Sequence, residues 1–431
     1  MLILPKLLTF CSFLSMVGWS RFSMVLLMGN YTPAQIGLLR SLSYLPKVLS
    51  GPVWSVWSDT GSPSKALMLS LFIGLASFEF VRLSLRDHWP FWLFCTLRLF
   101  RSATNSVSPL TDAVILHAAK THRTKSKADD ESFGRQRVFS SLAWGFGSLF
   151  VGQLIDQFGI DVIYPYTRVT ILLAMFITYL ISRTIEPSLT STGDGPDTSS
   201  PKPPPKAKPN PLRMVANLVS ENHKGIRRFA FQVSMLGFLM TLSDTVIPVH
   251  IEKMGGSRTL NGASTLVAIL GGVPFFWQSR QIYKKTSVWF MLRAASWALV
   301  LRMVMMSLVS SKDMFWLLML AQPLHGVTFA LMICGSTEFL TSLPGEMFST
   351  SSTIINTLFF VVGHGVGNIF WLKAMDMKGD HAESLYLLGA GIMLIDLLAG
   401  GLRDEAGGGG EGGGGGGEEE GEEVELISKI V

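Results

Sequence analysis

The chain has 431 residues, of which 48% are hydrophobic and 16% are charged, and its mean hydropathy is +0.37. These values exclude an ordinary soluble domain and indicate a membrane protein. The net charge of +5 reflects lysines and arginines gathered between apolar segments, so we interpret it as a topological signal and expect no nucleic-acid partner. The three cysteines all lie in apolar segments, which favours packing over a disulfide or metal framework.

Twelve segments are long and apolar enough to span a bilayer, which takes roughly 20 residues per helix. The first six lie near residues 5–28, 35–57, 65–85, 89–117, 135–158 and 163–182. The second six lie near residues 227–251, 259–278, 287–309, 312–341, 347–373 and 382–402. We interpret the first segment as a membrane helix and not as a cleaved signal, because no small-residue cleavage site follows it. The prediction is an all-α polytopic membrane protein with 12 transmembrane helices in two six-helix bundles.

Polar segments divide the chain into four expected parts. These are an N-terminal bundle at 1–183, a Pro-rich linker at 184–224, a C-terminal bundle at 225–402 and a Gly/Glu-rich tail at 403–431. The linker and the tail are too polar to build a core, so we expect both to be disordered. Lysines and arginines collect in the 4–5 loop, the linker and the 8–9 loop. The positive-inside rule therefore predicts a cytosolic N-terminus, linker and C-terminus.

Two stripes of polar residues run along the fourth and fifth apolar segments. The stripe on the fifth segment follows helical spacing and holds Arg137, Ser140, Ser141 and Trp144. On the fourth segment, the same spacing gives a stripe of Arg101, Asn105, Ser108 and Asp112. Lipid cannot satisfy such groups, so both stripes should face a cavity inside the bundle.

The roles of these side chains have two readings. Arg137 and Asp112 either bind substrate or form a structural ion pair, and Trp144 either contacts substrate or packs between helices. Arg21 and Arg101 add positive charge near the expected cavity. We therefore expect the site to tolerate an anionic or strongly polar solute.

The second six segments contain fewer polar side chains. We name His325, Asp244 and Arg302 as candidates for proton coupling, and place His364 in the same polar network. A histidine inside a membrane helix can carry a proton at physiological pH. Equally, it can hydrogen-bond to a carbonyl of a neighbouring helix.

Two motifs resemble those of a known transporter family. The stretch "GPVWSVWSDTGSPSK" (51–65) resembles the 2–3 loop signature of the major facilitator superfamily, with Asp59, Gly61 and Lys65 as gating residues. "FGRQRVF" (133–139) and "AWGFGSLFVG" (143–152) resemble the start of helix 5 in the lactose-permease-like oligosaccharide–proton symporters. The stretches "GGSRTLNGASTL", "GVPFF" and "LHGVTFALM" are similar to a broader branch of that group.

The resemblance implies two helical bundles that rock about a central site. It further implies that Arg137 and Asp112 bind solute hydroxyls, and that Trp144 stacks on a sugar face. The chain departs from the symporters where helix 8 lacks a carboxylate and where Thr328 stands one turn beyond His325. Proton coupling therefore has to use other groups.

We expect a secondary active transporter of a small polar solute, such as a sugar or nucleoside, with proton symport left open. The expected partners are this solute and the lipid bilayer; we expect a monomer without a cofactor. Metalloprotease, hydrolase and phosphate-loop motifs do not occur, so we do not expect an enzyme. The alternative is a membrane receptor or scaffold that has a transporter-like fold but does not transport.

Overall fold

The computed structural model describes residues 3–60, 62–123, 133–184, 225–341, 354–378 and 382–408, and every regular element in these ranges is a helix. The first half contains α1 (Ile3–Met28), α2 (Pro33–Leu42), α3 (Leu45–Thr60), α4 (Pro63–Arg86), α5 (Phe91–Thr104), α6 (Val107–Arg123), α7 (Phe133–Phe158), η1 (Ile160–Val162) and α8 (Ile163–Thr184). The second half contains α11 (Ile226–Thr241), η2 (Leu242–Val246), α12 (Ile247–Lys253), α13 (Arg258–Lys285), α14 (Val288–Ser307), η3 (Lys312–Met314), α15 (Phe315–Thr341), η4 (Thr357–His364), α17 (Gly365–Lys378) and α18 (Ala382–Gly408).

Within these ranges, ten helical segments are long and apolar enough to cross a membrane. The two other predicted spans, near 35–57 and 89–117, are also helical, but each is divided into two helices. Large apolar side chains on the outside of the bundle, such as Trp92 and Ile395, are exposed. Lipid would cover such side chains, so the all-α membrane prediction is confirmed.

A proline explains each divided span. Pro46 follows Leu42, the last residue of α2, by four positions, and Pro109 follows Asn105, just after α5, by four positions. The proline ring collides with the carbonyl four residues earlier and lacks an N–H, but it is tolerated in the first turn of the next helix.

The two breaks lie against each other. Ser102 of α5 donates its hydroxyl hydrogen to the carbonyl of Ser43 between α2 and α3. Ser70 of α4 donates to the carbonyl of Thr104 over 2.8 Å and accepts from the backbone N–H of Ser106 over 3.2 Å. Backbone groups freed by the breaks are thus satisfied inside the protein, as lipid requires.

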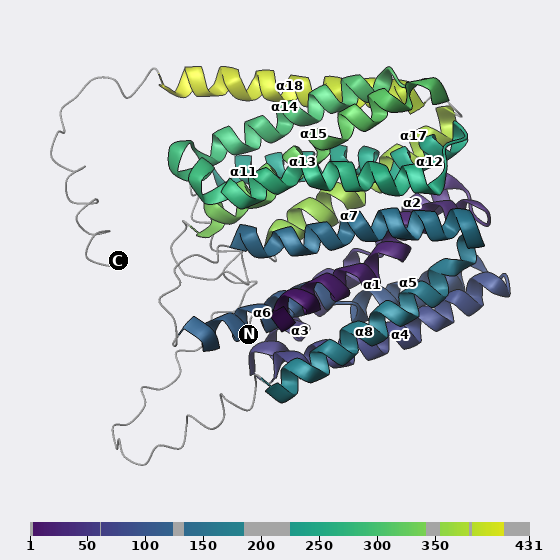
Figure 1. The fold of residues 1–431 in the computed structure, drawn as a ribbon. Coiled ribbons are helices and arrows are strands. Elements are labelled where there is room, and N and C mark those ends of the chain that lie inside the picture. The colour runs from purple at the N-terminus through teal and green to yellow at the C-terminus, as the bar shows by residue number, and fades with distance from the viewer. Residues whose placement is uncertain are drawn as a thin grey trace, which may run out of the picture.

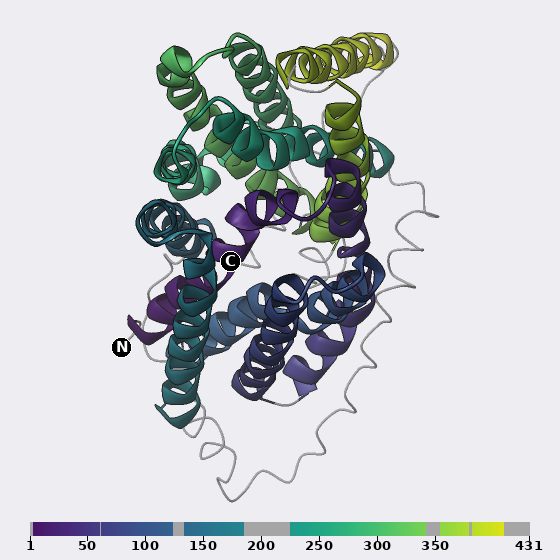
Figure 2. The same cartoon turned by 90° about the vertical axis from the view of Figure 1, so that its right-hand side faces the viewer.

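The two halves lie one above the other, with the first half below in Figure 1. They touch where α7 packs against α13 and α2 packs against α17. Figure 2, which looks along the helices, shows the purple segments of the early chain between the two groups. The backbones of α2 and α17 approach each other closely at this contact. A Cβ atom added at Gly37 of α2 would lie 2.6 Å from the carbonyl oxygen of Asn368, so only glycine fits there.

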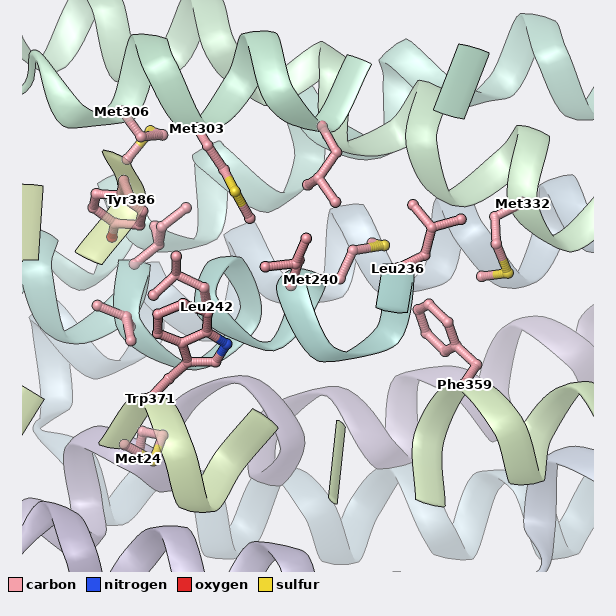
Figure 3. Packing of buried hydrophobic residues seen from close by; sticks show 14 of the residues in the cluster. Met24, Leu236, Met240, Leu242, Met303, Met306, Met332, Phe359, Trp371 and Tyr386 are labelled. Carbon is pink, nitrogen blue, oxygen red and sulfur yellow. The ribbon is translucent and has the colours of Figure 1, made fainter. Parts of the chain in front are cut away.

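We call the end of the bundle where α1 ends and α2 begins the joined end. Gly152 of α7 packs directly on the backbone of Arg258 there. The largest apolar cluster also crosses between the halves, since Met24 of α1 belongs to the same buried cluster as Trp371 of α17 (Figure 3). Trp371 is fully buried, and its ring N–H donates to the carbonyl of Phe238 over 2.9 Å. Apolar packing therefore fixes the halves together at this end.

Candidate functional site

Asp244 lies in η2, a π-helical turn inside the span that runs from α11 to α12. Pro248 follows it by four residues, so the normal helical bond to the carbonyl of Asp244 cannot form. A second π-helical segment, η4, ends at His364. Single π-helical turns inside α-helices frequently occur at functional sites.

Two histidines from different spans contact the carboxylate of Asp244. Its Oδ1 atom is 3.5 Å from Nε2 of His325 on α15, and its Oδ2 atom is 3.3 Å from Nε2 of His364. The side chain of His364 is only 5% exposed, but that of Asp244 is 39% exposed. A carboxylate between membrane helices thus keeps a large accessible surface.

Arg302 of α14 determines which ring nitrogen of neutral His325 carries the proton. The arginine is 2% exposed, and its Nη1 atom lies 3.0 Å from Nδ1 of His325, while Nη2 donates to Oε1 of Gln322 over 2.9 Å. A guanidinium can only donate, so Nδ1 of His325 must accept. The proton of the neutral ring then sits on Nε2 and points to Asp244.

His364 has the opposite arrangement. Its Nδ1 atom lies 3.1 Å from the carbonyl oxygen of Phe359, which can only accept, so Nδ1 carries a proton. In the neutral ring, Nε2 would then present a lone pair to Oδ2 of Asp244 at 3.3 Å. Two acceptors repel at this distance, so the contact requires one more proton, on His364 or on Asp244.

The first half completes the site. Arg40 of α2 donates from Nη1 to the hydroxyl of Thr245 over 2.8 Å, and Thr245 in turn donates to Oδ1 of Asn368 over 3.1 Å. Arg21 of α1 donates from Nη2 to the hydroxyl of Ser264 over 3.3 Å. Both arginines also interact electrostatically with Asp244. Since polar groups of both halves surround Asp244, its exposed surface faces the inside of the bundle.

Of the residues predicted in the second half, Asp244, His325 and Arg302 come together as one network. His364, which sequence reasoning placed only in a general polar network, is its fourth member. Arg40 was missed. Its signal was available, because a lone arginine in the apolar stretch "IGLLRSLSYL" requires a polar partner inside the protein.

The predicted stripe on the fourth span is wrong, because Asn105 has a non-helical backbone between α5 and α6. Arg101 and Asp112 therefore do not share one helical face. Arg101 is 6% exposed, and its guanidinium carbon lies 4.5 Å from the ring centre of Phe78 and 5.2 Å from that of Trp19. Asn105 in the break and Asp112 on α6 are both half-buried.

The other predicted first-half residues stay predictions. The side chains of Arg137 and Asp59, and the whole of Gly61, lie outside the described part of the chain. Trp144 is half-buried on α7. Lys65 is exposed in the first turn of α4, where its backbone N–H bonds to the capping hydroxyl of Ser62 over 3.2 Å.

Comparisons with known proteins agree with this architecture. An uncharacterized transporter of Bacillus subtilis (strain 168), YwbF, is 21% identical over 368 residues, which are 82% of this chain and 81% of that protein. A crystal structure of the nucleoside transporter NupG has a TM-score of 0.72 and 12% identity, covering 92% of this chain and 97% of that chain. The human organic anion transporter MFSD10 (TETRAN) has a TM-score of 0.59 and 13% identity, covering 92% and 98%.

The family described as "MFS_1 like family" matches residues 10–377. That range begins within α1, ends one residue before the end of α17 and includes the whole Asp244 network. The relative and both solved structures are named as transporters. The chain is therefore an integral, multi-pass membrane protein that belongs to the MFS_1 like family of the major facilitator superfamily.

Proposed function

We propose that this protein is a secondary active transporter that moves a small polar solute together with a proton, and that Asp244 and His364 hold this proton. The observation that carries the proposal is the partly exposed carboxylate of Asp244 between the two histidines. A carboxylate inside a membrane is costly and is found mainly in ion, proton and substrate pathways.

The contact between Asp244 and His364 supports proton binding, because it requires a shared proton. The titratable and charged groups that face this pair are Arg21 of α1, Arg40 of α2, Tyr44 before α3, Arg302 of α14 and His325 of α15. We expect release of the proton to depend on whether solute or solvent occupies the exposed side of Asp244, because either one changes the charge and the solvation around the carboxylate.

The position of the site supports alternating access. Its members come from both halves, and the contacts of Gly37 and Gly152 close the joined end beyond it. Opening that end requires α2 to leave α17 and α7 to leave α13, which is the rocking motion of two-bundle transporters. By the positive-inside expectation, the joined end faces away from the cytosol.

Uptake by proteoliposomes tests this proposal. Sugars, nucleosides and carboxylates are offered to the full-length chain at two pH values, with and without an imposed proton gradient. We expect saturable uptake of at least one solute, stimulated by a gradient directed toward the side of entry. The variants Asp244→Asn and His364→Gln should lose this stimulation but keep solute exchange, because exchange needs no net proton movement.

The control is His325→Gln, which can still accept from Arg302 without offering a titratable group. It should keep gradient stimulation. Equal stimulation of wild type and Asp244→Asn would overturn the assignment of the proton site. Solute binding without uptake or exchange in the wild type would instead favour the receptor hypothesis.

A further inference from the structure

Four cations of the first half lie close together beside the break between α2 and α3. These are Arg40 of α2, Lys47 of α3, and Arg98 and Arg101 of α5, which we call the cation cluster. Lys47 is near enough to Arg98 and Arg101 to be repelled by both, and Arg98 is repelled by Arg40. The cluster thus concentrates like charge inside the membrane region.

None of the described carboxylates pairs with Lys47, Arg98 or Arg101. The Nε atom of Arg98 and the Nη1 atom of Arg101 are buried and have no hydrogen-bond partner in the part of the chain that the structure describes. By contrast, other arginines of the first half have an acidic partner, as Arg168 has in Glu79.

Aromatic rings compensate these charges only in part. The guanidinium carbon of Arg98 lies 4.8 Å from the ring centre of Trp19, and Nζ of Lys47 lies 5.8 Å from that of Tyr44. Cation–π contacts are weaker than the cost of removing an ion from water. Asp244, the acid of the second half with which Arg40 interacts, already contacts two histidines.

We infer that the transported solute is a small organic anion, and that its carboxylate or phosphate group binds to Lys47, Arg98 and Arg40. This inference rests on the proposed transport function and adds the substrate class. Lys47 is exposed, while Arg98 and Arg40 are half-buried, so an anion entering between the halves meets the lysine first. Arginine then offers planar paired donors that fit carboxylate and phosphate oxygens.

Arg40 gives this site a link to the proton site. It donates to Thr245, the residue next to Asp244, and to the backbone carbonyl of Ser20 over 3.3 Å. An anion bound at Arg40 would neutralise part of the positive charge that acts on Asp244, and protonation of the Asp244 carboxylate would then become more favourable. Solute and proton would then bind together, which is the requirement for symport.

Uptake of charged and neutral solutes tests the inference with the full-length chain in proteoliposomes. The anion arms are lactate, succinate and glycerol 3-phosphate; the neutral arms are a hexose and a nucleoside. We expect uptake in an anion arm and competition from other members of that arm only. The carboxylate and phosphate arms distinguish the two sources of the negative group.

Variants then locate the site. Lys47→Gln and Arg98→Gln should lower anion uptake by about tenfold or more, the scale for one charge-assisted hydrogen bond, and Lys47→Arg should retain most of it. The matched control is Arg86→Gln, since Arg86 is exposed at the end of α4 and pairs only with its neighbour Asp87 over 2.7 Å. It should leave uptake unchanged.

Uptake of a neutral solute that no anion inhibits would overturn this inference and leave the transport proposal intact. If no arm is transported, the melting temperature of the purified chain in detergent decides the matter. A rise with succinate or glycerol 3-phosphate that Lys47→Gln abolishes would support an anion site without transport. No rise with either probe would overturn it.

Discussion

In the second half of the molecule, Arg302 donates to His325 and Gln322, and Asp244 contacts His325 and His364. In the first half, the guanidinium groups of Arg98 and Arg101 lie over the rings of Trp19 and Phe78. The second-half network contains an acid, Asp244, beside Arg302, although Nε of Arg302 and Nε2 of Gln322 have no hydrogen-bond partner among the described residues. In the first half, no described carboxylate pairs with Arg98 or Arg101, which suits a site whose acidic partner arrives with the solute.

Breaking the network around Arg302 in the second half should have the largest effect. Arg302→Met removes the donor to Nδ1 of His325 and a compensating charge for Asp244. Since removing one member of a buried charged network is strongly destabilising, we expect a loss of about 3 kcal/mol in unfolding free energy. Thermal unfolding in detergent measures the loss.

Arg302→Lys is the conservative comparison. A lysine carries the charge but not the fork that reaches both His325 and Gln322. We expect it to recover part of the stability and little of the gradient-driven uptake. Full recovery of both stability and gradient-driven uptake would mean that a positive charge at this position maintains the network without the forked shape of the guanidinium.

An arginine-to-methionine substitution in the first half should have the opposite effect on the free energy of unfolding. Arg101→Met replaces a buried guanidinium without an ionic partner by an apolar side chain of similar length. Such replacements are often neutral or stabilising, so unfolding free energy should rise by about 1 kcal/mol or stay level. Anion uptake should fall in the same variant; a large loss of stability would contradict the difference between the halves.

The sequence predicted the helical class and the approximate spans, and it named His325, Arg302 and His364, which lie around Asp244. Hydropathy and isolated charges suffice for this, because lipid penalises each exposed polar group. It did not predict that Arg101 and Asp112 lie on opposite sides of a break, since helical spacing assumes an unbroken helix. Pro109 was the sequence signal for this break. In the same way, Pro46 indicated the end of α2 and Pro248 indicated the irregular turn η2.

Which side chains meet was harder to foresee than which are buried. Arg40 and Thr245 are 205 residues apart in sequence and come together only through the packing of α2 on α17. Gly37, which permits that packing, has no distinguishing local pattern. The pairing of His364 with Asp244 depends likewise on two π-helical turns that shift their side chains around the helix.

A smaller effect is expected at the joined end, where one carboxylate of the first half caps a helix of the second. Asp156 of α7 accepts from the backbone N–H groups of Arg258 over 3.0 Å and Thr259 over 2.8 Å, at the start of α13. Losing a helix cap costs about 1 kcal/mol. Asp156→Ala should therefore favour opening at this end.

Spin labels at Gln157 and Lys253, both exposed near that end, report the change as a longer distance or a second population. Asp156→Asn keeps one acceptor oxygen and should have roughly half the effect. An unchanged distance distribution in Asp156→Ala would show that apolar packing alone holds the halves together there.

The smallest effect is expected for the paired charges of the first half. Glu79 of α4 accepts from Arg82 over 2.9 Å and also pairs with Arg168 of α8, and all three side chains are partly exposed. Partly exposed ion pairs contribute little, so Glu79→Gln should cost about 0.5–1 kcal/mol in thermal unfolding and leave anion uptake unchanged. The comparison with Lys47→Gln is direct, because the two variants change the net charge of the same half by one unit in opposite directions. If Glu79→Gln raised anion uptake as much as Lys47→Gln lowered it, uptake would follow the net charge of the first half and not the position of the cation cluster.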